Sequence, residues 1–202
     1  MTYSIIIILI LSVILHELGH GYCALLLGDT TARDRGRLTM NPLAHIDLFT
    51  TLILPAILIA MGLPALGGAK PVPVNPANFL QVSPRRGMML VGVAGPLVNF
   101  VLGILALACL YMLRGTDAVR TYDFLLYIFL VNMNLMAFNL LPVPPLDGSK
   151  VLLGLVSKNL AYKIYRHERM GLLVVMLLVI TRTLDPLFNR WMNFLETVLP
   201  AG

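Results

Sequence analysis

Hydrophobic side chains along this chain form long runs that short polar stretches separate. The longest runs cover residues 3–27, 48–64, 88–113, 122–141 and 170–184, and a shorter one covers residues 149–157. An apolar run of about 20 residues is long enough to cross a bilayer as an α-helix. The pattern therefore predicts an all-α polytopic membrane protein, a bundle of about five to six transmembrane segments.

Some of these runs leave the path through the membrane open. Residues 48–64 are interrupted by Pro55 and Gly62 and are only marginally long for a full span, so this segment either crosses or re-enters. The last run either ends near residue 184 or continues to Trp191 past the Asp185-Pro186 break. The first run has no basic region before it, so we expect an uncleaved helix and not a signal peptide.

The composition fits a membrane protein and argues against several other classes. The chain has 202 residues, of which 58% are hydrophobic and only 12% charged, whereas a soluble domain carries about 25% charged residues. We expect one membrane-embedded domain over residues 1–202 in contact with the lipid bilayer. The net charge of +5 comes from loop Lys and Arg near the membrane surface, so no nucleic-acid partner is expected. Cys23 and Cys109 lie in apolar runs, where a disulfide framework is not expected.

The first apolar run contains the sequence His16-Glu17-Leu18-Gly19-His20. Three ionisable side chains inside a bilayer-length helix are costly unless something compensates them. Two His at i and i+4 lie on one face of a helix and can bind a single Zn²⁺, while Glu17 is placed to accept a proton from a water at that metal. A chance match, with the His residues satisfied by backbone carbonyls, is the alternative.

Residues 65–87 form a Pro- and Gly-rich insert that interrupts the apolar pattern. Pro at alternate positions excludes a helix and a central strand but suits an edge strand, because successive N–H groups point to opposite edges. Pro71 and Pro73 would leave one edge without donors, whereas Lys70, Val72 and Val74 would keep theirs on the other. We expect this re-entrant or β-like stretch to bind substrate along that edge; a simple connector is the alternative.

The later runs contain polar residues that could complete a site. Asn99 is predicted to bond across helices as a structural polar residue. Residues 140–148 contain three Pro and end in Asp147, which is either a turn residue before Gly148 or a third zinc ligand. We favour the ligand, because two neutral imidazoles, one carboxylate and one hydroxide cancel the charge of zinc.

This set of residues predicts peptide-bond hydrolysis. His16, His20 and Asp147 would hold one zinc per chain, and Glu17 would transfer a proton from water to the leaving amine. An amide could donate to the oxyanion of the transition state, and Asn139 is the candidate.

Three motifs in this order resemble the site-2 protease family of intramembrane zinc metalloproteases. They are His16-Glu17-Leu18-Gly19-His20, Gly95-Pro96-Leu97-Val98-Asn99 and Asn139-Leu140-Leu141-Pro142-Val143-Pro144-Pro145-Leu146-Asp147-Gly148. The resemblance implies a His, His, Asp zinc site with the Glu as catalytic base, and cleavage of transmembrane helices in regulated intramembrane proteolysis. Residues 69–76 and 41–47 resemble a compact prokaryotic subgroup, bacterial and archaeal, and we find no length for PDZ or CBS domains.

Other functions and the orientation follow from the same pattern. A catalytically inactive membrane zinc-binding protein would keep the fold but lack a base, and a metal transporter would spread its ligands over several helices. The positive-inside rule puts the loops Arg33–Arg37 and Lys158–Arg169 on the cytoplasmic side of the cell membrane, with the active site toward that side. The expected partners are transmembrane protein substrates, and a homo-oligomer stays open.

Overall fold

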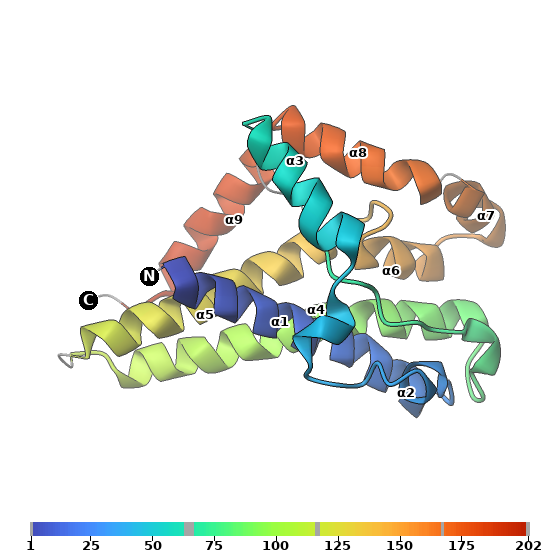
Figure 1. Ribbon diagram of the computed structural model, residues 1–202, viewed down its shortest axis with the longest axis horizontal. Helices are drawn as coiled ribbons and strands as arrows, with labels where there is room; N and C mark the ends of the chain where they lie inside the picture. Colours follow the sequence, from blue (N-terminus) through green and yellow to red (C-terminus); the bar gives the residue numbers. More distant parts are fainter. Residues whose placement is uncertain (1, 63–66, 116–117, 167, 201–202) are drawn as a thin grey trace.

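The computed structural model describes residues 2–62, 67–115, 118–166 and 168–200. Helices account for the regular structure of these residues (Figure 1). In chain order they are α1 (Thr2–Leu26), α2 (Thr31–Asp34), η1 (Pro42–His45), η2 (Leu48–Ile53), α3 (Leu54–Ala60), η3 (Pro76–Asn78), α4 (Pro84–Met112), α5 (Val119–Asn139), α6 (Asp147–Leu155), α7 (Lys158–Arg166), α8 (Glu168–Ile180) and α9 (Asp185–Val198). The predicted all-α membrane fold is confirmed.

The centre of the molecule is a layer of three long helices, α1, α4 and α5. They lie side by side along the long axis, and α4 runs opposite to its two neighbours (Figure 1). All three are long and apolar enough to cross a membrane. Helix α4 begins after Ser83, whose hydroxyl accepts from the amide of Arg86, and Pro84 fits its first turn.

The C-terminal part bends near the Asp185-Pro186 break, where the sequence left the end of the last span open. Helices α8 and α9 meet at an angle of 72° and count as one broken span or a re-entrant loop. Helix α9 packs against the α4–α5 pair, where Leu195 joins Leu110 and Phe129 in a fully buried cluster. The described residues therefore contain three helices of spanning length, or four with this pair, where the sequence suggested about five to six.

The predicted segment 48–64 forms a short helical unit. Asp47 starts it by accepting from the amides of Phe49 and Thr50, and helix then continues from Leu48 to Ala60. At about 1.5 Å per residue this unit is too short to cross a hydrocarbon core of about 30 Å, which favours the re-entrant alternative. Residues 63–66, where the predicted segment ends and the insert begins, lie outside the described residues.

The described part of the Pro/Gly-rich insert forms no strand. Residues 67–75 have no regular secondary structure, and η3 and the cap of α4 follow. Residues 70–74 therefore form no strand with other described residues, and their predicted pairing with a substrate stays a prediction. The segment instead lies beside α1, held by contacts described below.

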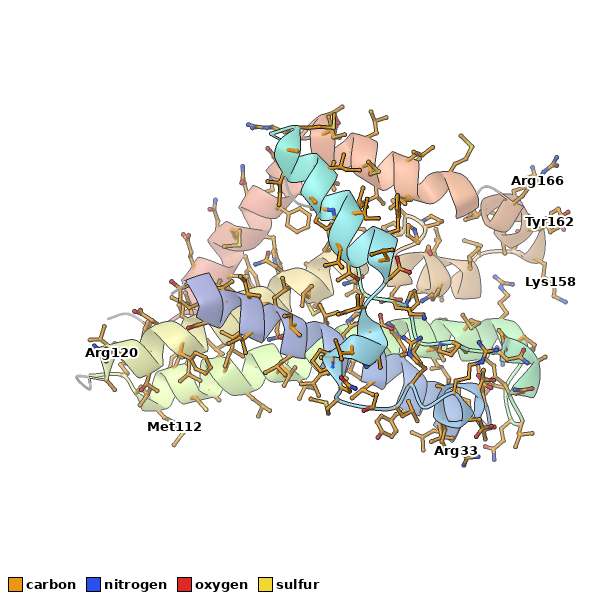
Figure 2. The ribbon with its side chains drawn as sticks, viewed as in Figure 1. Arg33, Met112, Arg120, Lys158, Tyr162 and Arg166 are labelled. Atoms are coloured by element: carbon orange, nitrogen blue, oxygen red, sulfur yellow. The ribbon has the colours of Figure 1, made fainter. Side chains whose placement is uncertain are left out.

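The two basic loops lie at the same end of the molecule. Figure 2 shows Arg33 on α2 and Lys158 and Arg166 on α7 at one end of the long axis, with Arg120 at the opposite end. This arrangement fits the sequence-based assignment of both loops to one side of the membrane.

Candidate metal centre

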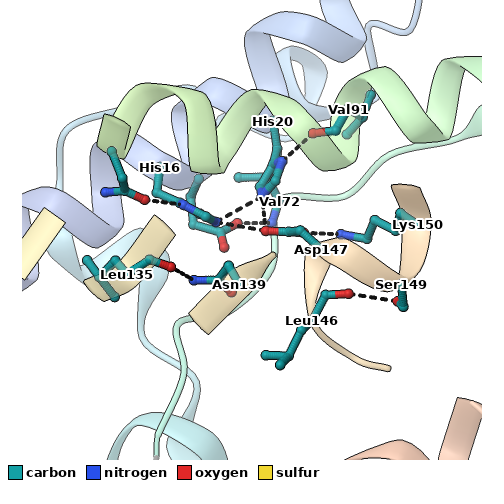
Figure 3. Close-up of polar contacts among 12 residues, drawn as sticks. His16, His20, Val72, Val91, Leu135, Asn139, Leu146, Asp147, Ser149 and Lys150 are labelled. Atoms are coloured by element: carbon teal, nitrogen blue, oxygen red, sulfur yellow. Dashed lines mark hydrogen bonds and ion pairs between the residues drawn. The ribbon is translucent and has the colours of Figure 1, made fainter. Parts of the chain in front are cut away.

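The two His residues of the first helix and Asp147 meet between α1, α4 and α6. His16 and His20 lie one turn apart on the face of α1 that packs against α4, and Asp147 is the first residue of α6. The Nε2 atoms of both His lie 3.0 Å from Asp147 Oδ2 and 3.0 Å from each other (Figure 3). All three side chains are buried.

The other nitrogen of each imidazole bonds to an oxygen acceptor. His16 Nδ1 donates to Asn99 Oδ1 at 2.5 Å, and His20 Nδ1 donates to the carbonyl oxygen of Val91 at 2.6 Å. The orientation of Asn99 is set by its own amide group, which donates to Asn132 Oδ1 at 2.9 Å and to the carbonyl oxygen of Ser12 at 3.4 Å. Both imidazoles therefore carry their proton on Nδ1 and direct a lone pair from Nε2.

When both imidazoles are neutral, three acceptor atoms thus converge at one point. Two imidazole lone pairs and a carboxylate oxygen at 3.0 Å repel one another unless a cation lies among them. Zinc bonds of about 2.0–2.2 Å at tetrahedral angles separate their ligand atoms by roughly 3.3 Å, close to the spacing found here. Nitrogen and carboxylate ligands are also the set that zinc prefers, so the residues present fit this metal.

Gly95 leaves the space on which this convergence depends. A Cβ atom at this position would lie 2.5 Å from His20 Nε2 and 2.6 Å from His16 Nε2. Only glycine lets the backbone of α4 approach the ligand atoms this closely. The space that a methyl group at position 95 would fill therefore borders the Nε2 atoms of both His residues.

Asp147 uses its second oxygen for an ion pair. Lys150 Nζ donates to Asp147 Oδ1 at 2.7 Å, so Oδ2 alone faces the imidazoles (Figure 3). Asp147 makes these contacts from the first turn of α6, one residue before the buried Gly148. In the structure this carboxylate bonds to His16, His20 and Lys150, and its role as a zinc ligand stays a prediction.

Glu17 lies next to this cluster but bonds elsewhere. Its Oε2 atom accepts from the backbone amide of Val72 at 2.8 Å, and the residue is half-buried. One carboxylate oxygen is therefore held by the Pro-rich insert.

The remaining predicted residues have varied surroundings. Asn99 bonds across helices as expected and in addition orients His16. Asn139, the last residue of α5, donates to the carbonyl oxygen of Leu135 at 2.9 Å (Figure 3). The amide of Lys70 donates to the carbonyl oxygen of His45 at 2.8 Å, and Val74 packs against a buried cluster near α1. Two of the three predicted edge donors, Lys70 and Val72, are thus bonded within the chain.

Four contributions to the site were missed in the sequence. The carbonyl of Val91 carries no residue-type signal at all. Lys150 is three residues after Asp147, a spacing that brings side chains together on a helix and could have indicated the ion pair. Asn132 was visible only as a polar residue in an apolar run. Gly95 belongs to the second motif, but its place beside the imidazole nitrogens was not foreseen, because small residues are common packing features of membrane helices.

Comparison with known proteins identifies the family. A family model described as peptidase family M50 matches residues 4–125 and 116–181, most of the chain. The chain belongs to peptidase family M50. This is the site-2 protease family that the three motifs resemble, and the resemblance is confirmed.

Relatives within family M50 carry matching descriptions. The chain is 37% identical over 185 residues to "Putative zinc metalloprotease YwhC" of Bacillus subtilis, covering 88% of this chain and 80% of that protein. It is 30% identical to "Putative zinc metalloprotease Rip2" of Mycolicibacterium smegmatis, over 94% of this chain and 69% of that protein. "Zinc metalloprotease MJ0392" of Methanocaldococcus jannaschii is 30% identical over 85% of this chain but only 41% of its own length. No solved structure matches the chain.

The family and the structure together define the coarse character of the protein. It is a multi-pass membrane protein of a metallopeptidase family whose cofactor is zinc. The His-His-Asp cluster is the group of three potential ligands found among the described residues.

Proposed function

We propose that this protein is an intramembrane zinc endopeptidase that hydrolyses peptide bonds in or near the transmembrane helices of other membrane proteins. The observation that carries the proposal is the buried convergence of two imidazole nitrogens and a carboxylate oxygen beside Glu17, between the spanning-length helices α1 and α4 and the start of α6. Such a cluster is costly in a membrane interior unless it serves a metal.

Each residue has a role that follows from its position. His16, His20 and Asp147 would hold the metal. Bound zinc supplies a Lewis acid that polarises a carbonyl and lowers the pKa of water to about 7. Glu17 accepts a proton from the attacking water with the carboxylate oxygen that Val72 leaves free, and later gives it to the leaving amine. Asn139 Nδ2 has a second N–H besides the one given to Leu135, and this N–H donates to the oxyanion.

The substrate must reach this site in an extended form. In an α-helix the peptide groups are bonded within their own chain, so hydrolysis requires local unwinding, and an unwound backbone in a dry site needs new partners. We propose that it lies along Lys70, Val72 and Val74 in the manner of strand addition. The amides of Lys70 and Val72 already bond to His45 and Glu17, so a substrate strand that used these donors would have to displace them.

The cellular setting follows from charge and length. We propose a single peptidase domain over residues 1–202 in the cell membrane, with the basic ends of α2 and α7 and the active site toward the cytoplasm. Its substrates are transmembrane proteins cleaved in regulated intramembrane proteolysis.

The decisive experiment compares the wild type with Glu17→Gln. Both variants, zinc-loaded and in the same detergent, are given a single-span membrane protein with a helix-breaking residue in its span. Glu17→Gln keeps the size of the side chain and loses the base, so turnover should fall by at least ~10²-fold while bound zinc is unchanged.

Glu196→Gln is the matched control, because Glu196 is exposed on α9 and should tolerate the change. Equal turnover by wild type and Glu17→Gln would refute the proposal. Wild-type zinc content in His20→Ala would refute the metal assignment.

A further inference from the structure

The insert contributes one backbone donor to the catalytic machinery. The amide of Val72 donates to Glu17 Oε2 at 2.8 Å. Pro71 and Pro73 on either side have no N–H, so Val72 is the single amide donor of this three-residue stretch. The alternating prolines therefore leave no neighbouring amide to compete for the carboxylate.

The stretch before Val72 is held from two sides. The amide of Lys70 donates to the carbonyl oxygen of His45 at 2.8 Å, and the carbonyl of Lys70 accepts from Arg37 Nη2 at 2.8 Å. Two residues earlier, the carbonyl of Gly68 accepts from the hydroxyl of Thr51 at 2.7 Å. The path of the backbone into Val72 is thus fixed by groups from the α2 region, η1 and η2.

The stretch after Val72 is held at the end of α1. The amide of Asn75 donates to Asp29 Oδ2 at 2.7 Å, and Asp29 is fully buried. The side chain of Val72 is only 7% exposed and lies against Gly21, where a Cβ atom would approach Val72 Cγ1 to 3.1 Å. Because both flanks and the side chain are fixed, the direction of the Val72 amide is fixed as well.

We propose that the Val72 amide is the positioning donor of Glu17 and serves the base, not the substrate, during turnover. The amide holds Oε2 and thereby directs Oε1 toward the water from which it takes a proton. The inference rests on the proposed function, because it assigns a partner to the general base. It also limits the substrate contacts of the insert to groups other than this amide.

A backbone donor is tested by removing the N–H alone. Incorporating 2-hydroxyisovalerate at position 72 of the full chain replaces the N–H with an ester oxygen and keeps the side chain. Losing a hydrogen bond to a charged group should lower kcat by ~10- to 10²-fold. KM and zinc content should stay within about twofold, because neither the substrate site nor the ligands change.

The matched control carries the same ester at Val82, which lies between η3 and α4 and outside the proposed catalytic and substrate-binding residues. Its kcat should equal that of the wild type. An ester at position 72 that raises KM and leaves kcat unchanged would overturn the proposal and assign the amide to the substrate. Normal kcat and KM would also overturn it.

A second measurement does not depend on activity. In protein labelled with ¹⁵N-valine, the Val72 amide resonance is assigned by its loss in Val72→Ile. An amide bonded to a carboxylate resonates downfield, so this proton should move upfield in Glu17→Gln, whose side chain is neutral. An unchanged Val72 resonance would overturn the proposal.

These outcomes separate the two ideas. If wild type and Glu17→Gln cleave at equal rates, the proposed function fails. If Glu17→Gln is inactive and the ester at position 72 is normal, only the role of the Val72 amide fails.

Discussion

Single contacts decide whether the predicted residues form a metal site. An imidazole can present either nitrogen, and the choice follows from the partner of the other one. The Asn99 side chain fixes which nitrogen His16 presents, and the Val91 carbonyl does the same for His20. Asn99 is in turn oriented by Asn132, so an amide pair between α4 and α5 aligns a ligand on α1.

Removing Asn99 should weaken zinc binding and leave the fold intact. In Asn99→Leu the His16 ring loses the acceptor that fixes its tautomer, and zinc affinity should fall by about 10- to 100-fold. Competition with a zinc chelator measures the affinity. The control is Asn134→Leu, because Asn134 on α5 bonds to its own helix at Leu130. Equal zinc affinities of the two variants would contradict the positioning role of Asn99.

At the level of elements, the close approach of α1 and α4 creates the site. Small residues let two helices pack tightly in a membrane, where hydrophobic burial provides little drive between them. Gly19 on α1 faces Ala94 on α4, where a Cβ would come within 2.9 Å of the carbonyl oxygen. Gly95 then faces the ligand nitrogens. The same packing that joins the helices therefore leaves room at the metal.

Gly95→Ala should abolish zinc binding without unfolding the helix. Alanine raises helix propensity by about 1 kcal/mol, but its methyl group would lie within 2.6 Å of both Nε2 atoms. Gly103→Ala is the control on the same helix, because its methyl group meets the flexible side chain of Met133. Zinc content and circular dichroism are measured on both. Full zinc occupancy in Gly95→Ala would show that the space left by glycine at position 95 is not needed for zinc binding.

At the level of the whole molecule, a buried carboxylate just after α1 holds the C-terminal part of the insert by hydrogen bonds. Asp29 follows α1 and accepts from Thr31, from the amide of Asn75 and from Asn78. Burial raises the pKa of Asp29, but the hydrogen bonds from Thr31, Asn75 and Asn78 outweigh burial and hold this pKa below its ordinary value. The ionised form of Asp29 is therefore the one that stabilises the attachment of the insert to the end of α1.

This linkage predicts a stability that depends on pH. Because the folded pKa lies below the unfolded value of about 3.9, the contribution of Asp29 is complete well above pH 4 and is lost as the pH falls through the folded pKa. Asp29→Asn should destabilise the protein by about 1–3 kcal/mol at pH 7, and by progressively less below pH 4. Thermal denaturation in detergent across this range measures the difference.

Asp34→Asn serves as the comparison, because Asp34 is exposed and its hydrogen bonds compete with water. It should change the denaturation temperature little at any pH. A constant difference between wild type and Asp29→Asn down to pH 3 would contradict the assignment to Asp29 ionisation.

The local features of this protein were determined by the sequence. Long apolar runs specify spanning helices because lipid leaves the backbone no other way to satisfy its polar groups. The spacing of His16 and His20 specifies one face because i and i+4 are one turn apart in any α-helix. Residues 48–64 are only marginally long for a full span, because an α-helix rises about 1.5 Å per residue and the hydrocarbon core is about 30 Å thick. The bend between α8 and α9 was marked only by the Asp185-Pro186 break, which did not reveal its angle of 72°.

Only the tertiary structure decided which distant groups meet. His16 and Asp147 are 131 positions apart, His16 and Asn99 are 83 apart, and Glu17 and Val72 are 55 apart. The His16–Asn99 contact depends on how closely α4 approaches α1, and the His16–Asp147 contact depends on where α6 begins. The Glu17–Val72 contact uses a backbone amide, which any residue except proline carries. Residue type states which chemistry is available, but the packing of the helices and the tethering of the insert determine which atoms come within hydrogen-bonding distance.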